Sequence, residues 1–243
     1  MAKALTLPVF DSSALVVAHP DDEVLWFSSI ISRVQRVIVC CEECADLPEL
    51  GAARRGARQA YPLSNVTWLA RPEPCSVHLA DWKHPVRTEY GMALNAPSAG
   101  AAGADRYRSA YRTLRADLRE ALRGTANVFT HNPWGEYGHP DHVQVSRVVG
   151  SLRQELGFEL RYTNYISPRS MAFAAEFLPR LVSDLRFPTD PVLAARIKGV
   201  YRAYHAWTWD KDYEPPDEEA FLKESDAPPS ESVSVPLNCV MTV

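Results

Sequence analysis

A histidine and three consecutive acids follow the most strand-like stretch of the sequence. His19, Pro20, Asp21, Asp22 and Glu23 come directly after the apolar run "ALVVA". Adjacent carboxylates repel each other, and a bound cation offsets that repulsion. Carboxylate oxygens together with an imidazole nitrogen suit zinc or a related divalent metal. One aspartate could instead cap a helix, but a cap needs one oxygen and explains neither the histidine nor the second acid.

A second cluster repeats this pattern later in the chain. His139, Pro140 and Asp141 follow the run "NVFTH" after a short loop, and His142 closes the cluster. Proline sets the first turn of a helix, so Asp141 and His142 should project from a helix start and His139 from the loop before it. Histidine and carboxylate from the first cluster, with histidine from the second, would make a three-ligand site with an open fourth position, as in catalytic zinc centres.

The two clusters can meet if the runs before them are strands of one sheet. β-rich runs alternate with helical stretches along the chain. This alternation predicts an α/β class, a Rossmann-like three-layer fold with a mostly parallel sheet flanked by helices. Ligands of such sheets bind at the carboxyl ends of the strands, where both clusters lie. The predicted strands are 14–18, 36–41, 65–70, 127–131 and 161–166, and the predicted helices are 23–33, 47–61, 105–123, 140–156 and 191–204.

Length and charge restrict the class of protein. The 243 residues, 46% of them hydrophobic, can bury one core, so we predict a single domain over residues 1–243. The net charge of -4 leaves no basic stripe for nucleic acid or an anionic membrane, and no apolar window is long enough for a membrane helix. The chain reaches Pro8 and Asp11 before a signal-peptide core could form, so we expect a cytoplasmic protein, with a homo-oligomer left open.

Two segments have compositions that argue against packed elements. Residues 71–104 contain prolines, glycines and the run "APSAGAAGA", and predict a functional or mobile loop that could form a wall or lid with Trp82 and nearby histidines. Residues from about 213 onward are acidic and proline-rich, with "EPPDEEAF" and "APPSES". They predict a tail that lies along the surface or is partly disordered.

The five cysteines are Cys40, Cys41, Cys44, Cys75 and Cys239. Their odd number and uneven spacing suit a reducing compartment better than a disulfide framework. The run "CCEEC" invites a metal interpretation, but cysteine-based zinc sites usually contain a second close pair, which this sequence lacks. We therefore interpret Cys40 and Cys41 as the end of a buried strand.

The two clusters resemble the marker motifs of the PIG-L/LmbE-like superfamily of zinc-dependent de-N-acetylases, which includes N-acetylglucosaminyl-phosphatidylinositol de-N-acetylase. Both "AHPDDE" and "HPDHV" occur intact and in the family's order, and the resemblance covers roughly residues 13–166. It implies zinc bound by His19, Asp22 and His142. The same nitrogen and oxygen ligands could hold Fe²⁺ instead.

The resemblance also implies catalytic roles for three residues. Asp21 would be the general base, and His139 would stabilise the oxyanion and protonate the leaving amine. Asp141 would orient His139, and a histidine held in this way can be protonated near neutral pH. The resemblance implies a small-molecule substrate, which is an N-acetylated amino sugar, a glycoside or a related natural-product intermediate.

The loop before His139 contains candidate substrate contacts. Trp134 and Tyr137 could stack on the face of a sugar, and Glu136 could accept hydrogen bonds from its hydroxyl groups. Alternatively, Trp134 could only anchor the loop and Tyr137 could only pack against it.

Three other functions remain open at this point. The same metal site could serve an amidase that cleaves a larger acyl group or a thiol conjugate. A non-catalytic sugar-binding module is a second alternative, although the intact Asp21, Asp22 and His139 argue against it. A phosphoesterase would more naturally use two metal ions, and the sequence offers no second ligand set for that chemistry.

Overall fold

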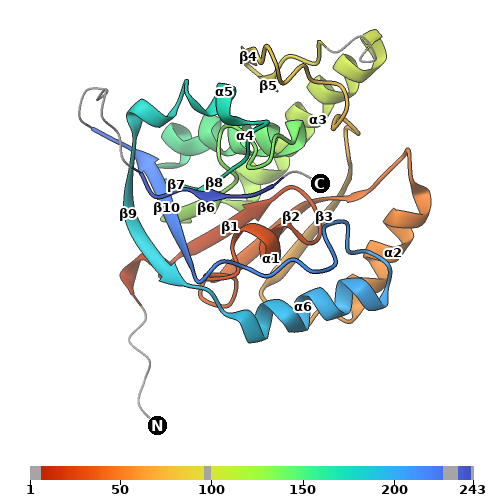
Figure 1. The fold of residues 1–243 in the computed structure, drawn as a ribbon, viewed down its shortest axis with the longest axis vertical. Helices are drawn as coiled ribbons and strands as arrows, with labels where there is room; N and C mark the ends of the chain where they lie inside the picture. The colour runs from red at the N-terminus through yellow and green to blue at the C-terminus, as the bar shows by residue number, and fades with distance from the viewer. Residues whose placement is uncertain (1–6, 96–99, 227–234, 242–243) are drawn as a thin grey trace.

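The computed structural model describes residues 7–95, 100–226 and 235–241. A seven-stranded sheet runs through its middle in the order β3-β2-β1-β6-β7-β10-β9 (Figure 1). The strands from β3 to β7 pair in parallel, whereas β10 is antiparallel to both of its neighbours. The predicted α/β class with a mostly parallel sheet is confirmed.

All five predicted strands form, with ends that move by a few residues. The strands of the sheet are β1 (Ser13–Val17), β2 (Arg36–Glu43), β3 (Val66–Pro72), β6 (Asn127–Thr130), β7 (Glu159–Thr163), β9 (Leu181–Pro188) and β10 (Glu218–Glu224). Two small sheets accompany it, formed by β4 (Arg87–Thr88) with β5 (Gly91–Met92) and by β8 (Tyr165–Ile166) with β11 (Asn238–Cys239). Residues 161–166, predicted as one strand, are divided between β7 and β8.

Helices cover both faces of the sheet, which makes the predicted three layers. One face carries α3 (Gly100–Ala121), α4 (Pro140–Leu156) and α5 (Met171–Ala174), and the other carries α1 (Asp22–Trp26), α2 (Pro48–Gln59) and α6 (Pro191–Ala203) (Figure 1). Single 3-10 turns occur at Pro8–Phe10 and Leu178–Arg180. No helix in the described ranges is long and apolar enough to cross a membrane.

Strand β1 contributes to both cores because successive side chains point to opposite faces of a sheet. Ala14 and Val16 pack into the core under α3 and α4, and Leu15 and Val17 pack into the core under α6. All five residues of the strand are buried. A strand covered on both faces reads as a continuous apolar run, which is why "ALVV" is visible in the sequence.

The predicted helix 23–33 is wrong beyond its first turns, because α1 ends at Trp26. The backbone N–H groups of Ser28 and Ser29 donate to the buried carboxylate of Glu219, over 3.1 and 3.0 Å, instead of to helical carbonyls. Their hydroxyl groups donate to the same carboxylate. A tertiary contact from the other end of the chain therefore stops this helix.

The predicted surface tail from about residue 213 is wrong for β10, which lies inside the sheet between β7 and β9. Its residues 219–222 are buried. The acidic composition concealed this strand, because Glu219 is buried with hydrogen-bond donors around it while the ends of the strand carry the exposed charges. The run "APPSES" lies outside the described residues.

The irregular segment 71–104 is more ordered than its composition indicates. It contains the β4–β5 hairpin, and α3 already begins at Gly100, so part of "APSAGAAGA" is helical. Alanine favours helix and outweighs the isolated glycines at this helix start. Residues 96–99 lie outside the described ranges.

Candidate metal and active site

The two histidine–aspartate clusters meet at one edge of the sheet, as their positions predicted. Strands β1 and β6 are parallel neighbours, with Val16 opposite Thr130. In the sheet order, the chain turns from β1 towards β2 and β3 on one side and towards β6 and β7 on the other. Crevices at such a switch point are where ligands of open α/β sheets bind.

His19, Asp22 and His142 form a group whose ligand atoms all lie within 4.8 Å of one another. Asp22 Oδ2 is 3.3 Å from His19 Nδ1, and Asp22 Oδ1 is 3.2 Å from His142 Nε2. All three side chains are buried. Burial opposes ionisation of Asp22, but the nearby His142 and His131 hold the pKa of this carboxyl well below its usual range. The three residues can therefore act together as metal ligands.

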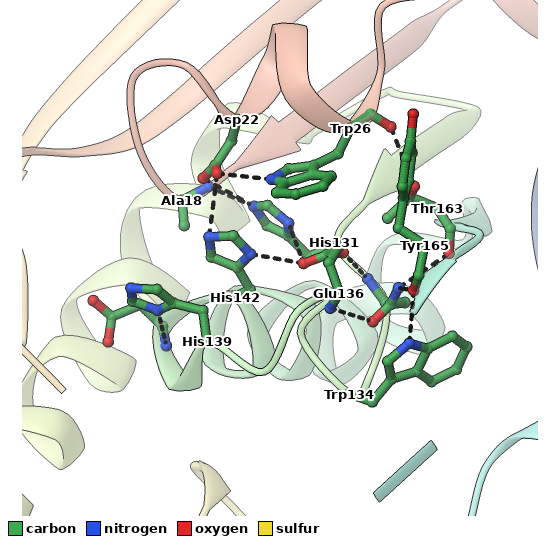
Figure 2. Close-up of polar contacts among 12 residues, drawn as sticks. Ala18, Asp22, Trp26, His131, Trp134, Glu136, His139, His142, Thr163 and Tyr165 are labelled. Carbon is green, nitrogen blue, oxygen red and sulfur yellow. Dashed lines mark hydrogen bonds and ion pairs between the residues drawn. The ribbon is translucent and has the colours of Figure 1, made fainter. Parts of the chain in front are cut away.

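Glu136 supports this group and does not face a substrate, so its predicted role in binding sugar hydroxyls is wrong. Its side chain is completely buried. Glu136 Oε2 lies 2.7 Å from His142 Nδ1 and 3.1 Å from His131 Nδ1, as Figure 2 shows. Oε1 accepts the backbone N–H of Asn132. These contacts engage both carboxylate oxygens, and the complete burial of the side chain keeps a ligand away from them.

His131 is a site residue that the sequence did not single out. It ends the run "NVFTH", so its place at the carboxyl end of β6 was the available signal. Its Nε2 accepts the backbone N–H of Ala18 over 2.9 Å and lies 3.4 Å from Asp22 Oδ2. Its ring stacks on that of His142, with 4.0 Å between centroids. His131 therefore ties the ends of β1 and β6 together behind the ligand group.

Trp134 anchors the loop, and its predicted stacking on a sugar is wrong. The ring has no exposed surface, and its Nε1–H donates to the backbone oxygen of Tyr165 over 2.8 Å. In Figure 2 it lies on the side of Glu136 away from Asp22. The apolar ring is buried because its single polar atom has a partner there.

Asp21 occupies a strained backbone position beside the ligand group. Its φ of 98° lies in the left-handed region, which is uncommon for a residue other than glycine and is typical of functional sites. Its Oδ2 accepts hydrogen bonds from the backbone N–H and the hydroxyl of Thr208, over 3.1 and 2.7 Å. Burial, followed by the charge of Asp22, raises the pKa of Asp21 to about 7.

His139 is held differently from the prediction. The carboxylate of Asp141 binds Ser76 and lies 3.3 Å from His19 Nε2, while it is the backbone N–H of Asp141 that donates to His139 Nδ1 over 3.1 Å. Burial, then the neighbouring His142 and His19, lower the pKa of His139 well below its ordinary value. This shift opposes the expected protonation of His139 near neutral pH. The proton of the neutral ring sits on Nε2, because Nδ1 is an acceptor.

A pocket of about 510 Å³ opens onto these residues. Tyr137, predicted as a substrate contact, lines it next to Trp209, whose ring centroid is 4.6 Å away. Trp209 and Thr208 come from the segment after α6, far in sequence from either motif, and no sequence pattern points to them. The pocket is lined by His19, Asp21, Asp22, Leu25, Leu47, Leu50, Arg54, Glu73, Tyr137, His139, Thr208, Trp209 and Asp210.

Of the described residues in the expected wall or lid, 71–95 and 100–104, only Glu73 lines this pocket. Trp82 packs against Phe173 and lies under the guanidinium of Arg169, away from the pocket. His84 is exposed beside Asp81. The segment therefore packs on the face of the sheet that carries α3, α4 and α5 more than it covers the site.

The sequence matches two curated deacetylases, each over 60% of this chain. It is 30% identical over 164 residues to 1D-myo-inositol 2-acetamido-2-deoxy-alpha-D-glucopyranoside deacetylase 2 of Catenulispora acidiphila, and the match covers 52% of that protein. It is 30% identical over 173 residues to deacetylase 1 of the same description from Saccharopolyspora erythraea, covering 54% of that protein. The chain thus spans about half the length of the curated relatives it matches. No protein-family model matches it.

The fold is similar to that of a solved deacetylase. The structure described as the zinc inhibited form of teicoplanin deacetylase Orf2 aligns with a TM-score of 0.51 and 14% sequence identity, over 88% of this chain and 99% of that one. This likeness concerns the fold. The two sequence matches agree with the resemblance to the PIG-L/LmbE-like superfamily that the motifs indicated.

Proposed function

We propose that this chain is a metal-dependent hydrolase of the PIG-L/LmbE-like kind that removes the N-acetyl group from an N-acetylated amino sugar. The observation that supports this most is the Nε2 atom of His142, which is buried without a hydrogen-bond partner among the described residues. This atom faces Asp22 Oδ1. A buried nitrogen lone pair pointing at a carboxylate is costly in itself and becomes favourable when a cation lies between them.

The donor set fits a divalent metal. His19, Asp22 and His142 would hold the ion, and two imidazoles with one carboxylate suit zinc and also Fe²⁺. Glu136 accepts the Nδ1 hydrogen of His142, which directs the other nitrogen towards the ligand position. When bound, the ion would activate a water molecule and polarise the acetyl carbonyl.

Asp21 would move the proton of the attacking water. One of its oxygens is fixed by Thr208, and the carboxyl lines the same pocket as the ligand group. A carboxyl with a pKa near 7 exchanges protons efficiently at neutral pH. The same group can then return the proton to the departing amine.

His139 would stabilise the oxyanion of the tetrahedral intermediate. Its ring lines the pocket, and its Nε2–H is available because Nδ1 is held by the backbone of Asp141. A neutral imidazole donor of this kind contributes a hydrogen bond where charge develops. Loss of such a donor typically costs about 3 to 4 kcal/mol of transition-state stabilisation.

The pocket walls suit an amino sugar. Tyr137 and Trp209 give aromatic faces on which a sugar ring can stack, and the buried Arg54 adds a charged donor to the lining of the same pocket. The names of the curated relatives describe deacetylases of an acetamido-glucopyranoside, which is the substrate class proposed here.

The test is acetate release, followed by NMR, from a panel of N-acetylated amino sugars and glycosides with metal-loaded protein. Asp21→Asn is the control for contaminating activity. Release that disappears in this variant would support the proposal. Stoichiometric metal binding without release from any member would contradict the proposed substrate class, and absence of both metal and release would favour a sugar-binding module.

A further inference from the structure

Cys44, Glu73 and Cys75 meet beside the pocket, although the sequence separates them. Cys44 follows β2 and Cys75 follows β3, and these strands are parallel neighbours with Glu43 opposite Pro72. The backbone N–H of Glu73 donates to the oxygen of Glu43 over 2.7 Å, which holds the two strand ends together. The sequence contains no second close pair of cysteines, but the pairing of β2 with β3 brings Cys75 next to Cys44.

The three side chains have the spacing of ligands around one ion. The two sulfur atoms and a carboxylate oxygen of Glu73 all lie within 4.8 Å of one another. Zinc holds sulfur at about 2.3 Å and carboxylate oxygen at about 2.0 to 2.2 Å, so its tetrahedral ligands are roughly 3.5 to 3.8 Å apart. Small side-chain rotations would bring the three atoms to that distance.

The surroundings favour a bound cation. Cys44 is buried, whereas Cys75 is partly exposed, so the site has both a closed wall and an access route. Arg54 binds Oε1 of Glu73, and the same atom lies 3.6 Å from His19 Nε2. Both contacts are made by Oε1 and orient the carboxylate. The other oxygen, Oε2, can then bind an ion that lies between the sulfur atoms.

We propose that Cys44, Glu73 and Cys75 form a second metal site, distinct from the His19–Asp22–His142 group, for a thiophilic divalent cation such as Zn²⁺, Cd²⁺ or Co²⁺. Sulfur ligands favour such ions over Mg²⁺ or Ca²⁺. Each cysteine loses its thiol proton to solvent as its sulfur binds the ion, so no oxidant or reductant takes part. Glu73 belongs to this site and also lines the pocket, which links the two sites physically.

The test is titration of the reduced, metal-free protein with Co²⁺. Only the proposed site supplies thiolate ligands, so it alone gives a sulfur-to-cobalt charge-transfer band in the near ultraviolet, while the His19–Asp22–His142 group gives visible d–d bands without it. We expect wild-type protein to bind two ions per chain with the charge-transfer band. The Cys44→Ser/Cys75→Ser variant should bind one ion and lose the band.

Cys239→Ser is the matched control, because Cys239 is exposed in β11 and distant in sequence from the site. It should bind cobalt as wild type does. Absence of the charge-transfer band in fully reduced wild-type protein, or its persistence in the double variant, would overturn the proposal. Visible d–d bands that survive in the double variant show that it is folded, and they report on the first site independently of the second.

Discussion

The Nδ1 of His142 lies 2.7 Å from Oε2 of Glu136, and this contact favours the ring tautomer that carries its hydrogen on Nδ1. A carboxylate can only accept, so Nδ1 carries the hydrogen and Nε2 keeps its lone pair. That lone pair points to Asp22 at 3.2 Å. A carboxylate behind a histidine ligand fixes its tautomer and strengthens its basicity.

Replacing Glu136 by glutamine should weaken metal binding. An amide cannot accept from His131, His142 and the backbone of Asn132 at once, so the tautomer of His142 is no longer fixed. We expect an affinity about 10 to 100 times lower, measured by competition with a chromogenic chelator. Glu159→Gln changes an exposed glutamate and should leave the affinity unaltered. Equal affinities for both variants would refute the supporting role of Glu136.

Removing the His142 imidazole should abolish stable metal binding. His142→Ala leaves one histidine and one aspartate in the ligand group, and catalytic metal sites rarely persist on two protein ligands. Metal content after gel filtration measures the effect, with His84→Ala as the control because that side chain is 82% exposed. Full metal occupancy in His142→Ala would show that the ligand assignment is incorrect.

Asp21→Asn should retain metal but lose most turnover. The amide can still accept the bond from Thr208, but it cannot take a proton from water. General base catalysis is typically worth about 10² to 10⁴ in rate, so kcat should fall by roughly that factor. Asp105→Asn, on the exposed side of α3, should have normal activity. Wild-type turnover by Asp21→Asn would exclude Asp21 as the base.

Trp134→Phe should reduce stability without changing KM. The variant loses the Nε1–H bond to Tyr165, so its free energy of unfolding should fall by about 1 kcal/mol in a urea titration. Trp82→Phe removes an indole N–H that has no hydrogen-bond partner among the described residues and should cost less. A raised KM for Trp134→Phe with unchanged stability would restore the substrate role that its burial contradicts.

Glu219 should make stability depend on pH. Burial raises the pKa of Glu219 above its usual 4.5, although its serine and tyrosine donors oppose the shift. The native state then keeps this proton at a pH where the unfolded chain has released it. The contribution of Glu219 to the free energy of unfolding therefore falls as pH rises from 4.5 to its native pKa and is constant above it, with a slope of at most about 1.4 kcal/mol per pH unit.

The measurement is the difference in unfolding free energy between wild type and Glu219→Gln across that range. This difference should fall as pH rises, because the amide does not titrate. Glu218→Gln, at a partly exposed pair with Arg186, is the matched control on the same strand. A difference for Glu219→Gln that rises with pH would show that its hydrogen bonds outweigh burial.

The sequence by itself determined the parallel part of the fold and the positions of the motifs. Strand β1 is buried on both faces and is therefore apolar after Ser13. His19 and Asp22 follow the end of β1 by a few residues, and His139 and His142 follow β6 across one loop, at the start of α4. These are local relationships that composition and spacing record. The meeting of the clusters followed from them, because the carboxyl ends of parallel strands share one edge of a sheet.

Only the tertiary structure decided which polar groups face the pocket and which support it. Glu136 and Trp134 lie beside Tyr137 in sequence, yet they are buried while Tyr137 lines the pocket. Glu219 ends α1 from the opposite end of the chain, and Cys75 joins Cys44 through the pairing of two strands. Such contacts depend on burial and on partners distant in sequence. The type and spacing of residues do not specify which side chains will be neighbours in the folded chain.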